Sequence, residues 1–229
     1  MHTLFLDIAS HEGLLACSTE ERVLAHRAID HRIGDHELVP LMEDVLREAG
    51  WSYKDLTHLV CVIGPGGFTS LRVGVSCINA LSWALKVPVA GIHLSDLYGA
   101  RVVGACHPSE HLTMTPCEPR TGDISSFLWL HSTKRTELFI RGFGDLAKEW
   151  LQPMHITIDD LLAKFHSPTT YPLQPTPYVG ELLPEHCSAI GKTGAEALSL
   201  RPLSDILPPF LSSLAYQTQV LQPWYGRGW

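Results

Sequence analysis

A glycine-rich turn has the clearest chemical potential in this 229-residue sequence. The stretch GPGGFT at 64–69 follows an apolar run and precedes a helical pattern. Glycines in such a turn permit positive φ angles and close backbone approach, and the N-terminus of the next helix can hold an anion. No Walker-type lysine follows, and Thr69 stands where a dinucleotide-binding loop has its third glycine. The turn is therefore either a tight strand-to-helix connection or a phosphate-binding loop, with candidate residues Gly64, Gly66, Gly67 and Thr69.

A carboxylate at the end of the first apolar run is the second chemical feature. Asp7 ends this run, and Ser10 lies in the turn that follows. A carboxylate and backbone N–H groups are what a magnesium-bound phosphate requires. Glu12 stands in the same turn, where it would repel a phosphate. We favour the interpretation of Asp7 as a lone strand-end acid. Asp7 and Ser10 remain candidate residues of a nucleotide site.

Three other patterns resemble reactive sites but lack essential members. His107 and His111 have the H-x-x-x-H spacing of a helical metal site, yet Pro108 does not suit a helix interior and no third ligand is evident. The sequence GKT at 191–193 has His186 where a Walker loop needs its first glycine. The six cysteines include no C-x-x-C pair. We expect no metal site, and no nucleophile–base pair can be assigned.

Composition limits the class of protein. The chain has 17 basic and 24 acidic side chains, a formal net charge of −7, which disfavours binding to nucleic acid by this chain alone. Hydrophobic residues make up 45%, enough for a globular core. The N-terminus lacks the basic region of a signal peptide, and no apolar run is long enough to span a membrane. We expect a cytoplasmic protein with no membrane association.

The first half of the chain predicts a mixed sheet with helices packed on it. Asp35 is a candidate N-cap of a helix whose apolar residues recur with helical spacing up to Ala49, and Gly50 ends it. Apolar and small residues surround the next helix almost completely, which predicts cover on more than one side. The expected strands are 4–8, 14–17, 22–28, 56–63 and 87–92, and the expected helices are 35–49, 69–85 and 95–101.

The second half is less regular, and no internal repeat is visible. Strands are expected at 112–116, 126–130 and 137–142, and a helix at 158–165 with Thr157 as its cap. A short strand is expected to end at 188–191, followed by a short helix at 194–200. A last helix is expected at 206–216, starting at its two prolines, Pro208 and Pro209.

The stretch GPGGFTSLRVG at 64–74 resembles the G-P-G-S-F-T-G-[LV]-R-[IV]-G signature of the TsaB (YeaZ) family. Other pieces follow in family order: LFLDIAS near the N-terminus, HELVP at 36–40 and VPVAGI at 87–92. The resemblance is good over residues 3–100 and thinner in PRTGD at 119–123, AIG at 189–191 and PWYGR at 223–227. Departures from the family pattern are Ala9, Gly67, Ser70 and the pair Glu118-Pro119.

The resemblance implies an α/β fold of the actin-like (ASKHA, ribonuclease H-like) type, with two lobes, mixed sheets and flanking helices. The expected N-terminal lobe is 1–101, the second lobe is 102–205, and residues 206–229 pack back on the first. The related TsaD proteins hold their metal with an H-x-x-x-H pair. Here that place has His93 and then Leu97, so the resemblance also implies no metal centre.

The resemblance further implies a non-catalytic scaffold that pairs with a TsaD-type transferase and supports threonylcarbamoyl transfer to adenosine beside the tRNA anticodon. A TsaE-type ATPase joins through the complex, tRNA is contacted only indirectly, and no cofactor is required. The helices at 36–49 and 69–85 would form the partner surface. Its expected residues are His36, Leu41, Asp44, Val45, Arg72, Ser76 and Asn79.

The sequence leaves four alternatives open. In the first, the two helices are only core elements of the chain's own fold. In the second, they bind a second copy of the chain. The third alternative is a stand-alone actin-like ATPase or kinase that uses Asp7 and the Gly64–Gly67 turn, with weak nucleotide binding as its remnant. The fourth is a peptidase, for which metal ligands and a nucleophile are missing.

Overall fold

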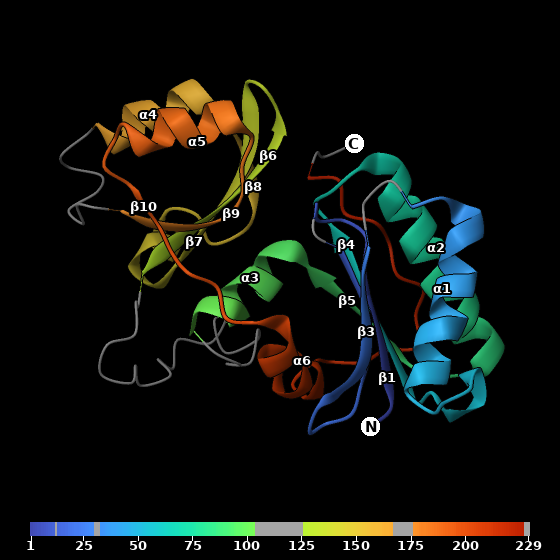
Figure 1. Ribbon diagram of the computed structural model, residues 1–229. Coiled ribbons are helices and arrows are strands. Elements are labelled where there is room, and N and C mark those ends of the chain that lie inside the picture. The colour runs from blue at the N-terminus through green and yellow to red at the C-terminus, as the bar shows by residue number, and fades with distance from the viewer. Residues whose placement is uncertain (12, 30–32, 104–125, 167–175, 227–229) are drawn as a thin grey trace.

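The computed structural model describes residues 1–11, 13–29, 33–103, 126–166 and 176–226, and its strands form two five-stranded sheets (Figure 1). The first sheet has the order β3-β2-β1-β4-β5. Strand β1 is buried along its whole length, as its continuous apolar run predicts. The strands are β1 (Thr3–Asp7), β2 (Gly13–Ser18), β3 (Val23–Ile29), β4 (His58–Gly64) and β5 (Val89–His93).

The second sheet has the order β10-β9-β6-β7-β8. Its strands are β6 (Phe127–Lys134), β7 (Glu137–Phe143), β8 (Met154–Thr157), β9 (Pro177–Glu181) and β10 (Glu196–Ala197). The α-helices are α1 (Asp35–Glu48), α2 (Phe68–Leu85), α3 (Leu94–Val103), α4 (Ile158–Phe165), α5 (Pro184–Gly191) and α6 (Leu203–Ser212). Two 3-10 turns, η1 (Tyr53–Asp55) and η2 (Gly144–Lys148), complete the described elements.

The two halves share one topology. In each, an antiparallel meander of three strands leads through a helix to a strand parallel to the first, and a second helix leads to one more parallel strand. Read from the edge of its meander, each sheet therefore has its strands in the same relative order, third-second-first-fourth-fifth. The repeat lies in the topology, although the sequence shows none.

Helices and sheets alternate in layers. Helices α1 and α2 cover one face of the first sheet, and α4 and α5 cover the outer face of the second (Figure 1). Helices α3 and α6 lie between the sheets, where Phe5, Trp129 and Phe210 share one apolar core. The partly buried Trp224 near the end of the chain packs against this core.

Several expected elements agree with the structure. The five strands of the first half and the helices at 69–85 and 158–165 lie within a few residues of their predicted ranges. Thr157 does cap α4, because its hydroxyl accepts from the Asp160 N–H at 3.1 Å. The predicted cap of α1 is off by one residue, since the helix already begins at Asp35 and its N-cap is Gly34.

The later part of the chain differs more from the prediction. Residues 184–191 form helix α5 rather than the end of a strand, because Pro184 takes the first helical position. The stretch expected as a helix at 194–200 contains strand β10. Helix α6 begins at Leu203, so its two prolines lie inside it. The strand expected at 112–116 lies outside the described residues.

Candidate functional site

The glycine turn connects β4 to α2, and two other segments of the same chain pack against it. Gly64 has φ +144°, and a Cβ there would collide with the carbonyl oxygen of Trp224. A Cβ on Gly66 would collide with the backbone of Ala9. The Trp224 N–H donates to the Ile63 carbonyl at 2.7 Å. These glycines allow two other segments to pack directly on the turn.

The two remaining turn candidates lie at the start of α2. Gly67 is the N-cap of the helix, and its carbonyl accepts from the Leu71 N–H at 2.9 Å. Gly67 and Thr69 are both exposed. The strand-to-helix turn predicted from the sequence is therefore confirmed, and Gly64 and Gly66 are the glycines on which other segments pack.

Asp7 lies at the carboxyl end of β1 and is 2% exposed. Its Oδ1 accepts from the N–H groups of Ala9 at 2.9 Å and Ser10 at 3.2 Å, and its Oδ2 accepts from the Ser10 hydroxyl at 2.7 Å. Burial raises the pKa of Asp7 to about 6, against the lowering effect of these hydrogen bonds. Both carboxylate oxygens therefore hold the turn that follows β1.

A buried polar cluster joins the two halves of the molecule beside Asp7. Glu181 of β9 accepts from the His11 N–H at 3.0 Å and from the Tyr98 hydroxyl at 2.9 Å. Its Oε2 lies 3.5 Å from Nδ1 of His131 on β6. Burial lowers the pKa of His131 to about 4, so this imidazole is neutral at pH 7 and its contact with Glu181 is not an ion pair.

Asp7 and His131 occupy matching places in the repeated topology. Strand β6 takes the place of β1 in the second sheet, and the run LWLH at 128–131 matches LFLD at 4–7. The position of β6 that corresponds to Asp7 therefore holds a histidine, His131, instead of an acid. The sequence offered no local signal for Glu181, which lies 170 residues from His11.

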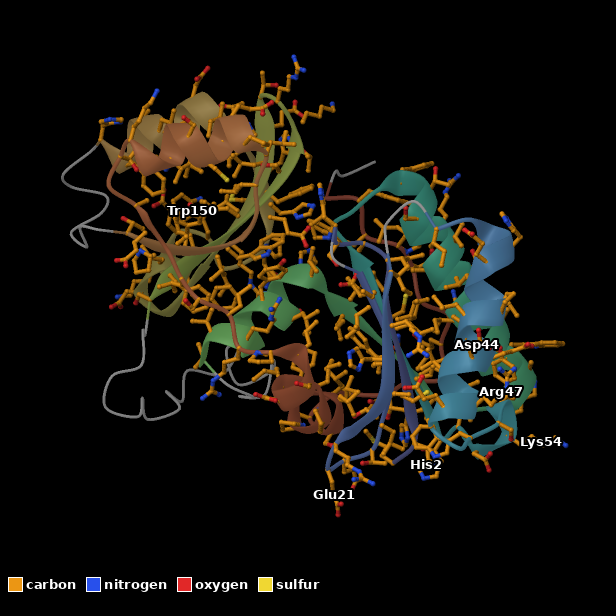
Figure 2. The ribbon with its side chains drawn as sticks, in the orientation of Figure 1. His2, Glu21, Asp44, Arg47, Lys54 and Trp150 are labelled. Atoms are coloured by element: carbon orange, nitrogen blue, oxygen red, sulfur yellow. The ribbon has the colours of Figure 1, made fainter. Side chains whose placement is uncertain are left out.

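The outer face of α1 carries two of the predicted partner residues. His36 and Asp44 are exposed, and Leu41 is half-buried. Figure 2 shows Asp44 and Arg47 on this outer face, where they form an ion pair at 2.7 Å. Val45 is 0% exposed and packs in the core between α1 and the first sheet. The selection of Val45 as a contact residue is therefore corrected, because the helical spacing did not fix which face points inward.

Helix α2 carries the other three predicted residues. Arg72 and Ser76 are exposed. Asn79 is half-buried and bonds to the chain's own C-terminal segment: its amide donates to the Leu221 carbonyl at 3.0 Å and accepts from the Leu221 N–H at 2.9 Å. Asn79 is therefore engaged within the chain.

Sequence reasoning missed the exposed aromatic residues of α2. Trp83 is 75% exposed and Phe68 is 49% exposed. Each carries a cation over its ring: the Lys86 Nζ lies 4.7 Å from the Trp83 centroid, and the Arg72 Cζ lies 4.1 Å from the Phe68 centroid. Their helical spacing places Phe68, Arg72, Ser76 and Trp83 along one stripe of α2.

His93 is the histidine at the place where the sequence predicts no metal centre. His93 ends β5, and its Nδ1 lies 2.8 Å from the Ser95 hydroxyl. Burial lowers its pKa to about 3, and its ring packs against Trp129 and Trp224. Within the described ranges, no three His, Cys, Asp or Glu side chains gather as a metal site. His107 and His111 lie outside those ranges. The helices of the described part include none long and apolar enough to cross a bilayer.

Parts of the chain are similar in sequence to known proteins of tRNA modification. The family model for TsaD, described as tRNA N6-adenosine threonylcarbamoyltransferase, matches residues 31–108. The tRNA threonylcarbamoyladenosine biosynthesis protein TsaB of Escherichia coli K12 is 28% identical over 92 residues, 40% of each chain. The Bacillus subtilis protein of the same name is 27% identical over 154 residues, 66% of this chain and 65% of its own. The matches thus cover less than two thirds of these relatives.

Two solved structures from Pseudomonas aeruginosa share the fold. An uncharacterized protein with similarity to peptidase YEAZ has a TM-score of 0.67 at 16% identity and covers 99% of both chains. YeaZ has a TM-score of 0.59 at 18% identity, over 93% of this chain and 89% of its own. The expected actin-like fold with two mixed sheets and flanking helices is therefore confirmed. Together with this fold, the glycine-turn signature and the two TsaB relatives support the assignment of the chain to the TsaB (YeaZ) family.

Proposed function

We propose that this protein is a non-catalytic subunit in the synthesis of threonylcarbamoyladenosine on tRNA. It binds a TsaD-type transferase and supports threonylcarbamoyl transfer to the adenosine next to the anticodon. Support comes from TsaB relatives named for this modification and from a transferase family model that matches residues 31–108. The net charge of −7 agrees with tRNA being bound by the partner instead of by this chain.

One observation carries the non-catalytic part of the proposal. Both oxygens of the Asp7 carboxylate already accept hydrogen bonds from the turn that follows β1. The glycine turn is packed against Ala9 and Trp224 of the same chain. A magnesium-bound phosphate needs the carboxylate and the turn's N–H groups. An ATPase or kinase would therefore have to break the hydrogen bonds of Asp7 to its own turn and the packing of the glycine turn on Ala9 and Trp224. No specific observation favours that alternative.

The partner surface in this proposal is the outer face of α1 and α2. We define it by the exposed residues His36, Val39, Asp44, Phe68, Arg72, Ser76 and Trp83. An exposed tryptophan beside a cation is the type of residue that contributes most to protein interfaces. The transferase family model matches the segment that contains both helices, so the partner is expected to carry a similar helix pair. Two similar helix pairs can pack face to face with approximate two-fold symmetry.

The similarity to TsaB proteins supports further parts of the proposal. A TsaE-type ATPase joins through the complex, and the isolated chain forms a homodimer when the transferase is absent. Residues 1–101 with 206–229 act as the partner-binding lobe, and 102–205 as the second lobe. The protein works in the cytoplasm and needs no cofactor of its own.

Binding of the purified chain to the TsaD-type protein of the same cell tests the proposal. We expect a stable heterodimer by light scattering, and an affinity at least tenfold lower for Arg72→Asp, because a charge reversal at an interface leaves an unpaired charge. Arg22→Asp is the matched control, since Arg22 is an exposed arginine in the β2–β3 turn of the same lobe. No complex with the wild-type chain, combined with saturable binding of ATP and Mg²⁺ that Asp7→Ala abolishes, would support the ATPase alternative.

A further inference from the structure

The C-terminal segment 217–226 lies along the first lobe as a brace. It begins at the open edge of the first sheet, where Val89 of β5 and Gln217 exchange two backbone hydrogen bonds at 2.8 and 2.9 Å. Figure 1 shows this segment in red, continuing from α6. Leu221 is 4% exposed and belongs to the core beneath α2. The brace therefore closes the sheet edge and becomes part of the core.

Further contacts attach the brace to α2, β4, β5 and β7. The Asn79 side chain makes both a donor and an acceptor bond to the Leu221 backbone. The Trp224 N–H reaches the Ile63 carbonyl at the end of β4. The Trp224 ring then packs against His93 with centroids 4.4 Å apart, and against Phe139 of β7 with centroids 5.3 Å apart. The path of the backbone up to Tyr225 is therefore fixed by both lobes.

Tyr225 is placed by this path against the exposed stripe of α2. Its ring lies 4.9 Å from the Phe68 ring, and its hydroxyl oxygen accepts from the Arg72 Nε–H at 3.3 Å. The Arg72 guanidinium also lies over the Phe68 ring. Two side chains from separate parts of the sequence thus restrain one exposed arginine.

We infer that Tyr225 is a positioning residue, which holds Arg72 and Phe68 in the arrangement that the transferase partner binds. This inference rests on the proposed function. An arginine side chain has many rotamers in water, and each rotamer frozen on binding lowers affinity. A side chain already held by a ring below and a hydroxyl beside it loses less freedom when the partner docks.

Positioning of Arg72 by Tyr225 can be separated from the contribution of the brace to stability. Removing only the Tyr225 hydroxyl leaves the ring contact with Phe68 and the buried Leu221 in place. Tyr225→Phe should therefore leave the melting temperature unchanged and weaken partner binding about threefold, the order expected for one partly exposed hydrogen bond. The matched control is Tyr178→Phe, which makes the same change on β9 of the second sheet.

A double-mutant cycle tests whether Tyr225 acts through Arg72. We expect Tyr225→Phe to have no further effect on affinity in an Arg72→Ala background, because its target is gone. Additive effects of the two substitutions, or an unchanged affinity of the Tyr225→Phe single variant, would overturn the inference.

A measurement on the free protein separates this inference from the proposed function. In ¹⁵N NMR of the wild-type chain, the Arg72 Nε–H should exchange slowly and be ordered, and both properties should be lost in Tyr225→Phe but kept in Tyr178→Phe. If the wild-type chain fails to bind the transferase, the proposed function is wrong, and a restrained Arg72 would then show a positioning effect without that partner. Identical Nε–H behaviour in all three proteins would contradict the positioning effect itself.

Discussion

Buried Asp7 and His131 have shifted pKa values that make the stability of the fold depend on pH. Burial disfavours the charge of Asp7 and raises its folded-state pKa from the usual 3.8 to about 6. The folded state therefore binds a proton at higher pH than the unfolded state, and Asp7 adds stability as the pH falls from about 7 to 4. His131 has the opposite effect, because its folded pKa of about 4 lies below its usual 6.5. Its contribution to stability is lost over about the same range.

The variant Asp7→Asn should remove the stability that Asp7 adds as the pH falls. A shift of about two pKa units corresponds to about 3 kcal/mol, so the variant should lose up to that much more stability than wild type between pH 7 and pH 4. Urea denaturation at several pH values in this range measures the slope. The control is Asp159→Asn, at an exposed acid in the first turn of α4. Parallel pH profiles for wild type and Asp7→Asn would contradict the assignment of a buried, charged Asp7.

At the scale of elements, α1 and α2 each have one face packed on the first sheet and one exposed face, and the exposed faces form the proposed partner surface. The sequence predicted both helices and their apolar character, but it could not tell which apolar residues point outward. Val45 and Trp83 illustrate this, because the first is buried and the second is exposed. Apolar and small residues surround α2 almost completely, so the sequence alone does not indicate which residues are exposed. The packing of α2 against the sheet determines that.

Two alanine substitutions should separate these faces. Val45→Ala removes buried methyl groups and should lower the free energy of unfolding by roughly 1–3 kcal/mol, with partner affinity unchanged below the melting temperature. Trp83→Ala should change stability by less than about 0.5 kcal/mol and weaken partner binding tenfold or more. Calorimetry and titration of the two variants check this. The control is Leu151→Ala, at an exposed apolar residue of the second lobe. A reversed pattern would mean that α2 is not a partner helix.

The prediction of elements was weakest where prolines and short strands dominate. Residues 188–191 are expected to end a short strand, but they lie in helix α5, for which Pro184 is a good first residue. Strand β10 has only two residues and pairs with β9, so its position depends on a distant neighbour. Pairing of this kind leaves little trace in the local sequence.

At the scale of the whole molecule, the two lobes are held together by groups far apart in the sequence. Glu181 links the turn after β1 to helix α3 and lies beside β6. The fold class followed from the glycine-turn signature and the apolar pattern of the first 100 residues. The repeated topology and this inter-lobe cluster did not, because both arise from contacts between segments that share no local pattern.

Removing Glu181 should therefore weaken the association of the lobes. Glu181→Ala leaves the Tyr98 hydroxyl and the His11 N–H without this acceptor, which should lower the free energy of unfolding by roughly 1–3 kcal/mol. Glu185→Ala is the control, because Glu185 is an exposed residue whose ion pair with Arg135 spans 3.7 Å. Urea denaturation compares the two variants, and an equal effect of both would contradict a linking role for Glu181.

The central claim is that this chain supports catalysis by another protein. The most direct measurement is threonylcarbamoyl transfer to tRNA by the TsaD-type transferase of the same cell, with and without this chain. We expect transfer that depends on the chain, is reduced by Arg72→Asp and Trp83→Ala, and is unaffected by Asp7→Asn under conditions where that variant is folded. Transfer at the same rate without the chain would show that the chain does not support the transferase.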